Sequence, residues 1–102
     1  MSTPDLNLDF DKVYHNEQEN RFEIRLGTEI AELTYARQGE KVLVLLHTGV
    51  PPAWEGRGIG SRLVKAALDY ARQRGYKIIP LCPFVAAYLR RHPEYQDLVV
   101  KE

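Results

Sequence analysis

The sequence has little of what marks several large classes of protein. Its 102 residues include one cysteine, which excludes an internal disulfide framework and a cysteine-rich zinc module. No apolar run approaches the roughly 20 residues that cross a membrane, and the start lacks the basic and apolar segments of a signal peptide. The 14 basic and 14 acidic side chains cancel, whereas a general nucleic-acid binder is strongly basic. We therefore expect a soluble, cytoplasmic, monomeric protein that binds neither nucleic acid nor membrane.

The length bounds the number of domains. A chain of this size buries roughly 60–70% of its unfolded surface, which is enough for one core. We expect residues 12–102 to form that domain. Residues 1–11 show no sustained apolar pattern, so we expect them to form a flexible end.

Charge is unevenly distributed behind the neutral total. Residues 1–20 hold five acidic side chains and one basic one, whereas residues 57–91 hold eight basic side chains and one acidic one. Such a basic stretch fits a small polyanion. On charge alone, a solvated helix face is the better explanation.

Apolar periodicity predicts the order of the elements. Residues 21–26 and 29–37 alternate as half-buried strands do, and the apolar run 42–46 predicts a central strand covered on both faces. A long amphipathic helix follows from Ile59 and ends at Gly75. A strand over 77–81 comes next, then a helix over 84–91 that Pro83 opens and Pro93 closes, and residues 98–100 fit a last strand.

This order predicts an α+β fold. An N-terminal antiparallel meander followed by β-α-β-α gives a mixed, mostly antiparallel sheet with the helices packed on it. The crossover through the long helix makes its two flanking strands parallel.

The segment between the apolar strand and the long helix is rich in glycine. Gly56, Gly58 and Gly60 stand where unpaired backbone N–H groups and the helix dipole form a seat for an anion. The pattern favours a phosphate or pyrophosphate ligand, although a tight structural turn also needs glycine. A Walker phosphate loop requires a lysine that Gly60-Ser61-Arg62 lacks, and the glycine spacing differs from that of a dinucleotide fingerprint.

Residues 55–60 resemble the pyrophosphate loop of the acetyl-CoA-dependent N-acetyltransferase superfamily (GNAT), Gln/Arg-x-x-Gly-x-Gly/Ala, with Glu55 where Gln or Arg is usual. Residues 81–84 and 88–95 are similar to the minimal single-domain branch of that superfamily, and the resemblance covers about residues 12–100. It implies a GNAT-like fold and acetyl-CoA as the acetyl donor. The implied cofactor-binding residues are His47, Thr48, Gly49 and Val50 at the strand end, Glu55, Gly56, Arg57, Gly58, Ile59, Gly60 and Ser61 in the loop, and Arg90 and Arg91, which with Arg57 would meet the adenosine-phosphate end.

Three side chains are candidates for catalysis. In the branch that the chain resembles, a cysteine at the position of Cys82 is the proposed catalytic residue and acetyl acceptor, although a lone cysteine is more commonly a small buried hydrophobe. His47 suits a base for the amine or for Cys82, or is a structural histidine. Tyr88 stands where the superfamily often has a general acid for the CoA thiolate, or packs beside Phe84.

The remaining candidates have simpler explanations. His15 has no partner at metal-ligand spacing, so we expect no metal. His92 suits a helix end through the dipole, and we expect Trp54 to pack over the glycine loop.

Together these features predict an acetyl-CoA-dependent N-acetyltransferase that acts on an unidentified amine, a protein amine included. The alternative is a CoA- or acyl-CoA-binding interaction module with little or no catalysis. If the resemblance is misleading, the third function that fits the sequence is binding of a phosphate ester or a nucleotide without CoA.

Overall fold

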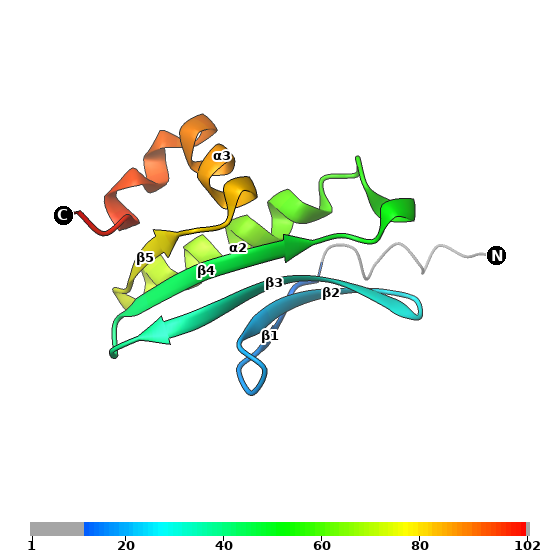
Figure 1. Cartoon of the computed structure of the whole chain (residues 1–102), viewed down its shortest axis with the longest axis horizontal. Coiled ribbons are helices and arrows are strands. Elements are labelled where there is room, and N and C mark those ends of the chain that lie inside the picture. The colour runs from blue at the N-terminus through cyan, green and yellow to red at the C-terminus, as the bar shows by residue number, and fades with distance from the viewer. Residues whose placement is uncertain (1–11, 102) are drawn as a thin grey trace.

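A computed structural model describes residues 12–101, so the flexible end expected over residues 1–11 lies outside the described residues. A single five-stranded sheet has the strand order β1-β2-β3-β4-β5 (Figure 1). Four of its strands form an antiparallel meander, and the last is parallel to β4. The strands are β1 (Tyr14–Asn16), β2 (Arg21–Leu26), β3 (Glu29–Gln38), β4 (Val42–Gly49) and β5 (Lys77–Pro80).

Helices connect and follow the last two strands. A short 3-10 helix, η2 (Pro52–Trp54), and then α2 (Ile59–Arg74) lead from β4 to β5, and α3 (Pro83–Arg91) and the 3-10 helix η3 (Pro93–Leu98) follow. The α+β class and the meander followed by β-α-β-α are confirmed. None of the helices in the described part is long and apolar enough to cross a membrane.

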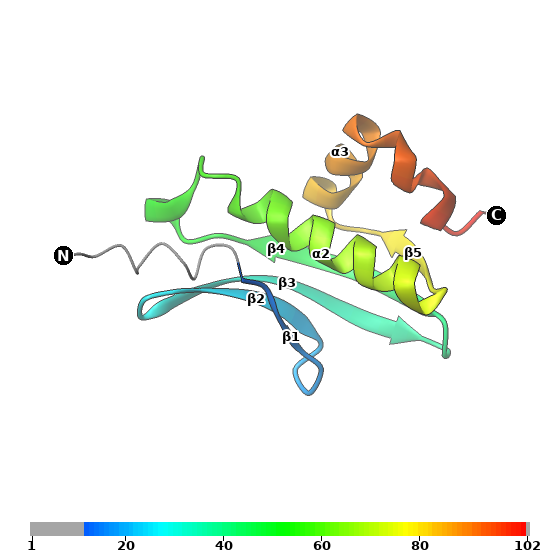
Figure 2. The same ribbon diagram turned by 180° about the vertical axis from the view of Figure 1, so that it is seen from behind.

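Both long helices lie on one side of the sheet. Figures 1 and 2 show α2 running alongside β4, and α3 packs against β4, β5 and α2. The core between these layers contains Leu33 and Leu45 from the sheet and Leu63 and Leu68 from α2, all without exposed surface. The opposite face of the sheet carries no helix among residues 12–101.

That open face corrects the expectation for the apolar run 42–46. The central strand is β3, and β4 lies one place from the edge. Leu43 and Leu45 are fully buried, but Val44 is half-buried and Leu46 is 43% exposed. The run is apolar because it combines two core positions with three on a thinly covered face.

The two ends of the described chain also differ from expectation. The strand β1 was not predicted, because its three residues, Tyr14, His15 and Asn16, are too few and too polar to show a periodicity. Residues 98–100 do not form a strand. Leu98 ends η3, and Val99 makes a single parallel bridge to Ile78.

A β-bulge near the end of β4 decides which side chains face the core. Tyr35 pairs with Leu45 and Thr34 pairs with His47, so Leu46 has no partner in the ladder. After such an extra residue, each following side chain of the strand points to the opposite face of the sheet from the one that strict alternation would give. Thr48 therefore pairs with the buried Leu33 on the core side, and His47 lies on the open side.

Candidate functional site

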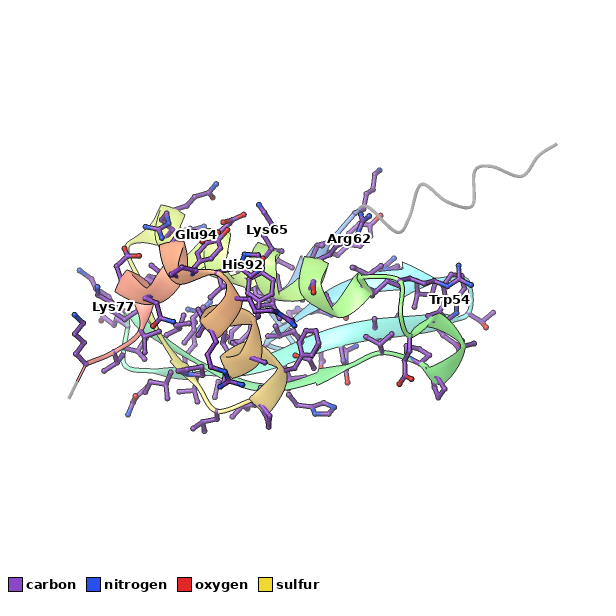
Figure 3. The ribbon with its side chains drawn as sticks, turned by 90° about the horizontal axis from the view of Figure 1, so that it is seen from above. Trp54, Arg62, Lys65, Lys77, His92 and Glu94 are labelled. Atoms are coloured by element: carbon purple, nitrogen blue, oxygen red, sulfur yellow. The ribbon has the colours of Figure 1, made fainter. Side chains whose placement is uncertain are left out.

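A cleft of about 400 Å³ lies where β4 ends and α2 and α3 begin. Figure 3 shows Trp54, which borders the cleft from η2, at the opposite end of the molecule from Lys77. Most residues of the predicted cofactor loop line this cleft, together with the strand end and the first turn of α3. The lining residues are Thr48, Val50, Trp54, Glu55, Gly56, Gly58, Ile59, Gly60, Ser61 and Phe84.

The glycine loop leads into a helix start whose first backbone amides lie at the cleft. Gly56 and Gly58 have positive φ angles of 82° and 78°, a conformation that residues with a β-carbon rarely adopt. Gly58 caps α2, so the N–H groups of Ile59, Gly60 and Ser61 come first in the helix and have no intrahelical acceptor. Together with the helix dipole they can hold an anion.

Gly60 allows α2 to approach α3 closely. A β-carbon at this position would lie 2.9 Å from Cζ of Phe84, well inside van der Waals contact. Phe84 forms a wall of the cleft and is 38% exposed. Sequence reasoning missed Phe84, because it contacts Gly60, a residue of another helix that lies 24 positions earlier in the chain.

Trp54 lines the loop side of the cleft, and Arg57 lies against its ring. The guanidinium carbon of Arg57 lies 5.1 Å from the centre of the Trp54 ring, which is a cation–π distance. Arg57 itself is exposed and is not among the lining residues. Trp54 therefore packs against the loop as expected, and it orients a basic side chain beside the anion seat.

Cys82 lies beside the cleft, where α3 begins. It is the N-cap of α3 and is 3% exposed. Its Sγ is 3.4 Å from Oγ1 of Thr48, a residue that lines the cleft. Burial raises the pKa of the Cys82 thiol, but hydrogen bonds from the Thr48 side chain and from the backbone at Val85, Phe84 and Thr48 outweigh it, and the net pKa is below the ordinary value.

His47 lies on the other side of the sheet from Cys82. Its side chain is exposed, and its Nε2 is 3.2 Å from where a β-carbon on Gly49 would lie, so the ring extends along the open face of β4. Thr48, which follows it, contacts the Cys82 sulfur from the core side. The structure thus brings Thr48, and not His47, to Cys82.

Tyr88 lies one helical turn beyond Phe84 on α3 and is not among the cleft-lining residues. Its ring stacks on His92 with centroids 4.0 Å apart and is 5% exposed. Burial raises the pKa of Tyr88; the positive charge of Lys65 opposes this, and the carboxylates of Asp69 and Glu94 add to it. In this position the side chain packs α3 against α2.

The structure does not bring Arg90 and Arg91 to the cleft. Both are exposed in the last turn of α3, about 10 Å along the axis from its first turn. The resemblance grouped them with Arg57 at the adenosine-phosphate end of the donor, whereas the length of α3 separates them from the cleft.

The remaining histidine has structural partners. His15 stacks on Phe22 with ring centroids 4.1 Å apart, and its Nε2 is 2.6 Å from the hydroxyl of Tyr35. Among residues 12–101 no group of three or more His, Cys, Asp or Glu side chains is placed to hold a metal ion.

Comparisons with known proteins agree with this architecture. The family described as GCN5-related N-acetyl-transferase matches residues 21–98. The protein NATD1 of Mus musculus is 36% identical over 89 residues, covering 85% of this chain and 81% of the mouse protein, and NATD1 of Homo sapiens is 35% identical over 85% and 79%. The NMR solution structure of a GCN5-like protein from Staphylococcus aureus is similar, with a TM-score of 0.71, 31% identity and 90% of each chain covered. The chain therefore belongs to the GCN5-related N-acetyltransferase family.

Proposed function

We propose that this protein is an acetyl-CoA-dependent N-acetyltransferase that transfers an acetyl group to an amine, with Cys82 as its catalytic residue. The observation that carries the proposal is the arrangement of the cleft. One opening of about 400 Å³ joins the amides of the glycine loop to Thr48, whose hydroxyl contacts the Cys82 sulfur. An anion seat at one end and a thiol at the other suit a long thioester with a phosphate tail.

The residues present fit acetyl-CoA as the donor. The first amides of α2 would receive the pyrophosphate, and Arg57, held over Trp54, would add a positive charge beside it. The bulge interrupts the ladder between β3 and β4 near the strand end, and the backbone from His47 to Val50 is the part that would bind the pantetheine. Backbone N–H groups there would also stabilise the oxyanion that forms when the thioester carbonyl is attacked.

Cys82 supports a covalent route. Thiolates are strong nucleophiles, and the pKa of Cys82 is below its ordinary value because hydrogen bonds to the sulfur outweigh burial. In this route the Cys82 sulfur takes the acetyl group from CoA, and the amine then takes it from the sulfur. Direct attack of the amine on acetyl-CoA is the competing route, in which Cys82 only shapes the cleft.

The experiment compares the wild-type chain with Cys82→Ala in acetyl transfer to polyamines, amino acids and peptides. We expect Cys82→Ala to abolish turnover while acetyl-CoA still binds, and mass spectrometry of the wild type without acceptor to show one acetyl group on Cys82. Retained turnover in Cys82→Ala would exclude the covalent route. Tight binding of acetyl-CoA with no transfer to any amine would instead assign a CoA-binding interaction module.

The monomeric state and the cytoplasmic location stay part of the proposal. The acceptor, a protein amine included, is the part that the amine panel is designed to identify.

A further inference from the structure

We infer that Thr48 is a positioning residue for Cys82, and that its hydroxyl group donates a hydrogen bond that holds the sulfur at the cleft in its charged form. This inference rests on the proposed function and adds a residue to its site. It begins from one contact, the 3.4 Å between Oγ1 of Thr48 and Sγ of Cys82. The two residues come from different elements, since Thr48 is the last residue but one of β4 and Cys82 is the N-cap of α3.

The bulge is what brings Thr48 to this side. Leu43 and Leu45 face the core, so strict alternation would point residue 47 inward and residue 48 outward. The unpaired Leu46 reverses this order, and Thr48 pairs with Leu33 on the core face. A β-bulge re-aims side chains and is common beside active sites. Here the side chain that it re-aims is the one that meets the thiol.

The surroundings of the sulfur explain why a hydroxyl group matters there. Cys82 is 3% exposed, so water does not solvate a thiolate at this position well. Burial raises the pKa of Cys82, and the groups that lower it are neutral donors, the Thr48 side chain first and then backbone groups of Val85, Phe84 and Thr48. His47, the titratable side chain next to Thr48 on β4, lies on the open face and does not appear among these groups. A hydrogen bond to a charged acceptor is stronger than one to a neutral one, so the Thr48 hydroxyl favours the thiolate over the thiol.

In the covalent route, a hydroxyl group that stabilises the Cys82 thiolate acts at two points. The Cys82 thiolate forms a bond to the acetyl carbonyl carbon while the bond from that carbon to the CoA sulfur breaks, and the CoA thiolate takes up a proton from solvent to replace the one that Cys82 gave up. The amine then forms a bond to the same carbon, the bond to Cys82 breaks, and the amine loses a proton to water. Sulfur is negatively charged at the start and again at the end, and the Thr48 hydroxyl faces it at both points.

The test measures the thiol directly. Because the chain has one cysteine, protein labelled with ¹³C at the cysteine β-carbon gives one NMR signal whose shift follows ionisation of Cys82 with pH. We expect Thr48→Val to raise the pKa of Cys82 by about one, which leaves about tenfold less thiolate near neutral pH. Thr48→Ser, which keeps the hydroxyl, should titrate as the wild type does.

Controls separate this role from a general effect on the fold. Thr34→Val changes the same residue type on β3, where Thr34 pairs with His47, and should leave the titration unchanged. If Thr48→Val does not fold, Thr48→Ala removes the same hydroxyl with a smaller side chain. A hydroxyl-free variant that folds and titrates as the wild type does would overturn the role of Thr48.

Two further readouts keep this result distinct from the proposed function. If Thr48 has the inferred role, Thr48→Val lowers kcat/KM for acetyl transfer about tenfold at neutral pH and moves the pH profile upward, whereas Thr48→Ser keeps the wild-type profile. A wild type that neither binds acetyl-CoA nor transfers its acetyl group would overturn the proposed function. The titration of Cys82 needs no acetyl-CoA, so it decides the role of Thr48 in either case.

Discussion

At the level of single residues, the close contact between Gly60 and Phe84 is the feature that shapes the cleft wall. Gly60→Ala would place a methyl group 2.9 Å from the end of the Phe84 ring. Phe84 is partly exposed, so its ring should move into the cleft and the helices should stay in place. We expect the free energy of unfolding to change by less than about 1 kcal/mol, since alanine is also the better helix former. Acetyl-CoA affinity, measured by calorimetry, should fall at least about tenfold.

A second substitution tests the cause. Phe84→Leu removes the atoms that the new methyl group would meet, so Gly60→Ala/Phe84→Leu should bind acetyl-CoA more tightly than Gly60→Ala alone. Equal affinity of Gly60→Ala and the wild type would show that this wall does not shape the binding site.

Glu55 is the residue of the loop that fits its proposed ligand least well. Glu55 lines the cleft that we propose receives pyrophosphate. Glu55 is exposed, and two like charges about 4 Å apart in water repel by about 1 kcal/mol, so Glu55→Gln should tighten acetyl-CoA binding about three- to tenfold, and less at high salt. The matched control, Glu40→Gln, lies in the exposed turn between β3 and β4 and should change nothing. Weaker binding by Glu55→Gln would mean that the carboxylate contacts the donor favourably.

Residue type and spacing predicted the loop but not every partner within the site. Gly56, Gly58 and Gly60 indicated an anion seat because glycine serves a specific backbone need, and all three line the cleft. The placement of His47 and Thr48 depends on one unpaired residue, Leu46, which no periodicity reveals within an apolar run. Phe84 depends on a contact between two helices. Local patterns carry neither kind of information.

At the level of elements, helix ends were the most predictable feature. Gly58 and Gly75 take the left-handed conformation at the two ends of α2, and Pro83 opens α3, because each residue type suits its position. The strand β1 was missed because three residues are too few to show an alternation.

One hydrogen bond between α2 and η3 makes stability depend on pH. The hydroxyl of Tyr95 donates to Oδ1 of Asp69 over 2.7 Å, and Lys65 donates to the other oxygen. Burial raises the pKa of Tyr95 to about 12, with the bond to Asp69 adding to it. Burial also raises the pKa of Asp69, but the bonds from Lys65 and Tyr95 outweigh this and leave it below its ordinary value. Tyr95→Phe should therefore lower the free energy of unfolding by about 1 kcal/mol at neutral pH.

The sign of the pH effect on stability follows from the direction in which folding shifts the pKa of Asp69. Because its pKa is lower in the folded chain than in the unfolded one, its contribution is present above about pH 4 and is lost as pH falls through the folded value. The difference between the wild type and Tyr95→Phe should therefore shrink below pH 4 in urea unfolding measured across pH. A difference that stays constant down to pH 2 would show that Asp69 does not contribute through its charge.

At the level of the whole molecule, the order of elements was enough for the fold class. A meander followed by one β-α-β unit leaves few ways to arrange a sheet, and the observed strand order is the simplest of them. The sequence did not reveal that one face of the sheet is open, because Val44 and Leu46 are as apolar as their buried neighbours. Coverage depends on where the helices pack, and both pack on the same side.

The central claim is that the cleft between β4, α2 and α3 binds acetyl-CoA, and an NMR titration of the labelled protein with acetyl-CoA tests it most directly. We predict amide shift changes concentrated at Thr48 and Val50, through the glycine loop to Ser61, and at Cys82 and Phe84, with the turn between β2 and β3 unchanged. ATP should displace acetyl-CoA poorly. An absence of shift changes at millimolar acetyl-CoA, or changes confined to the open face of the sheet, would contradict the claim.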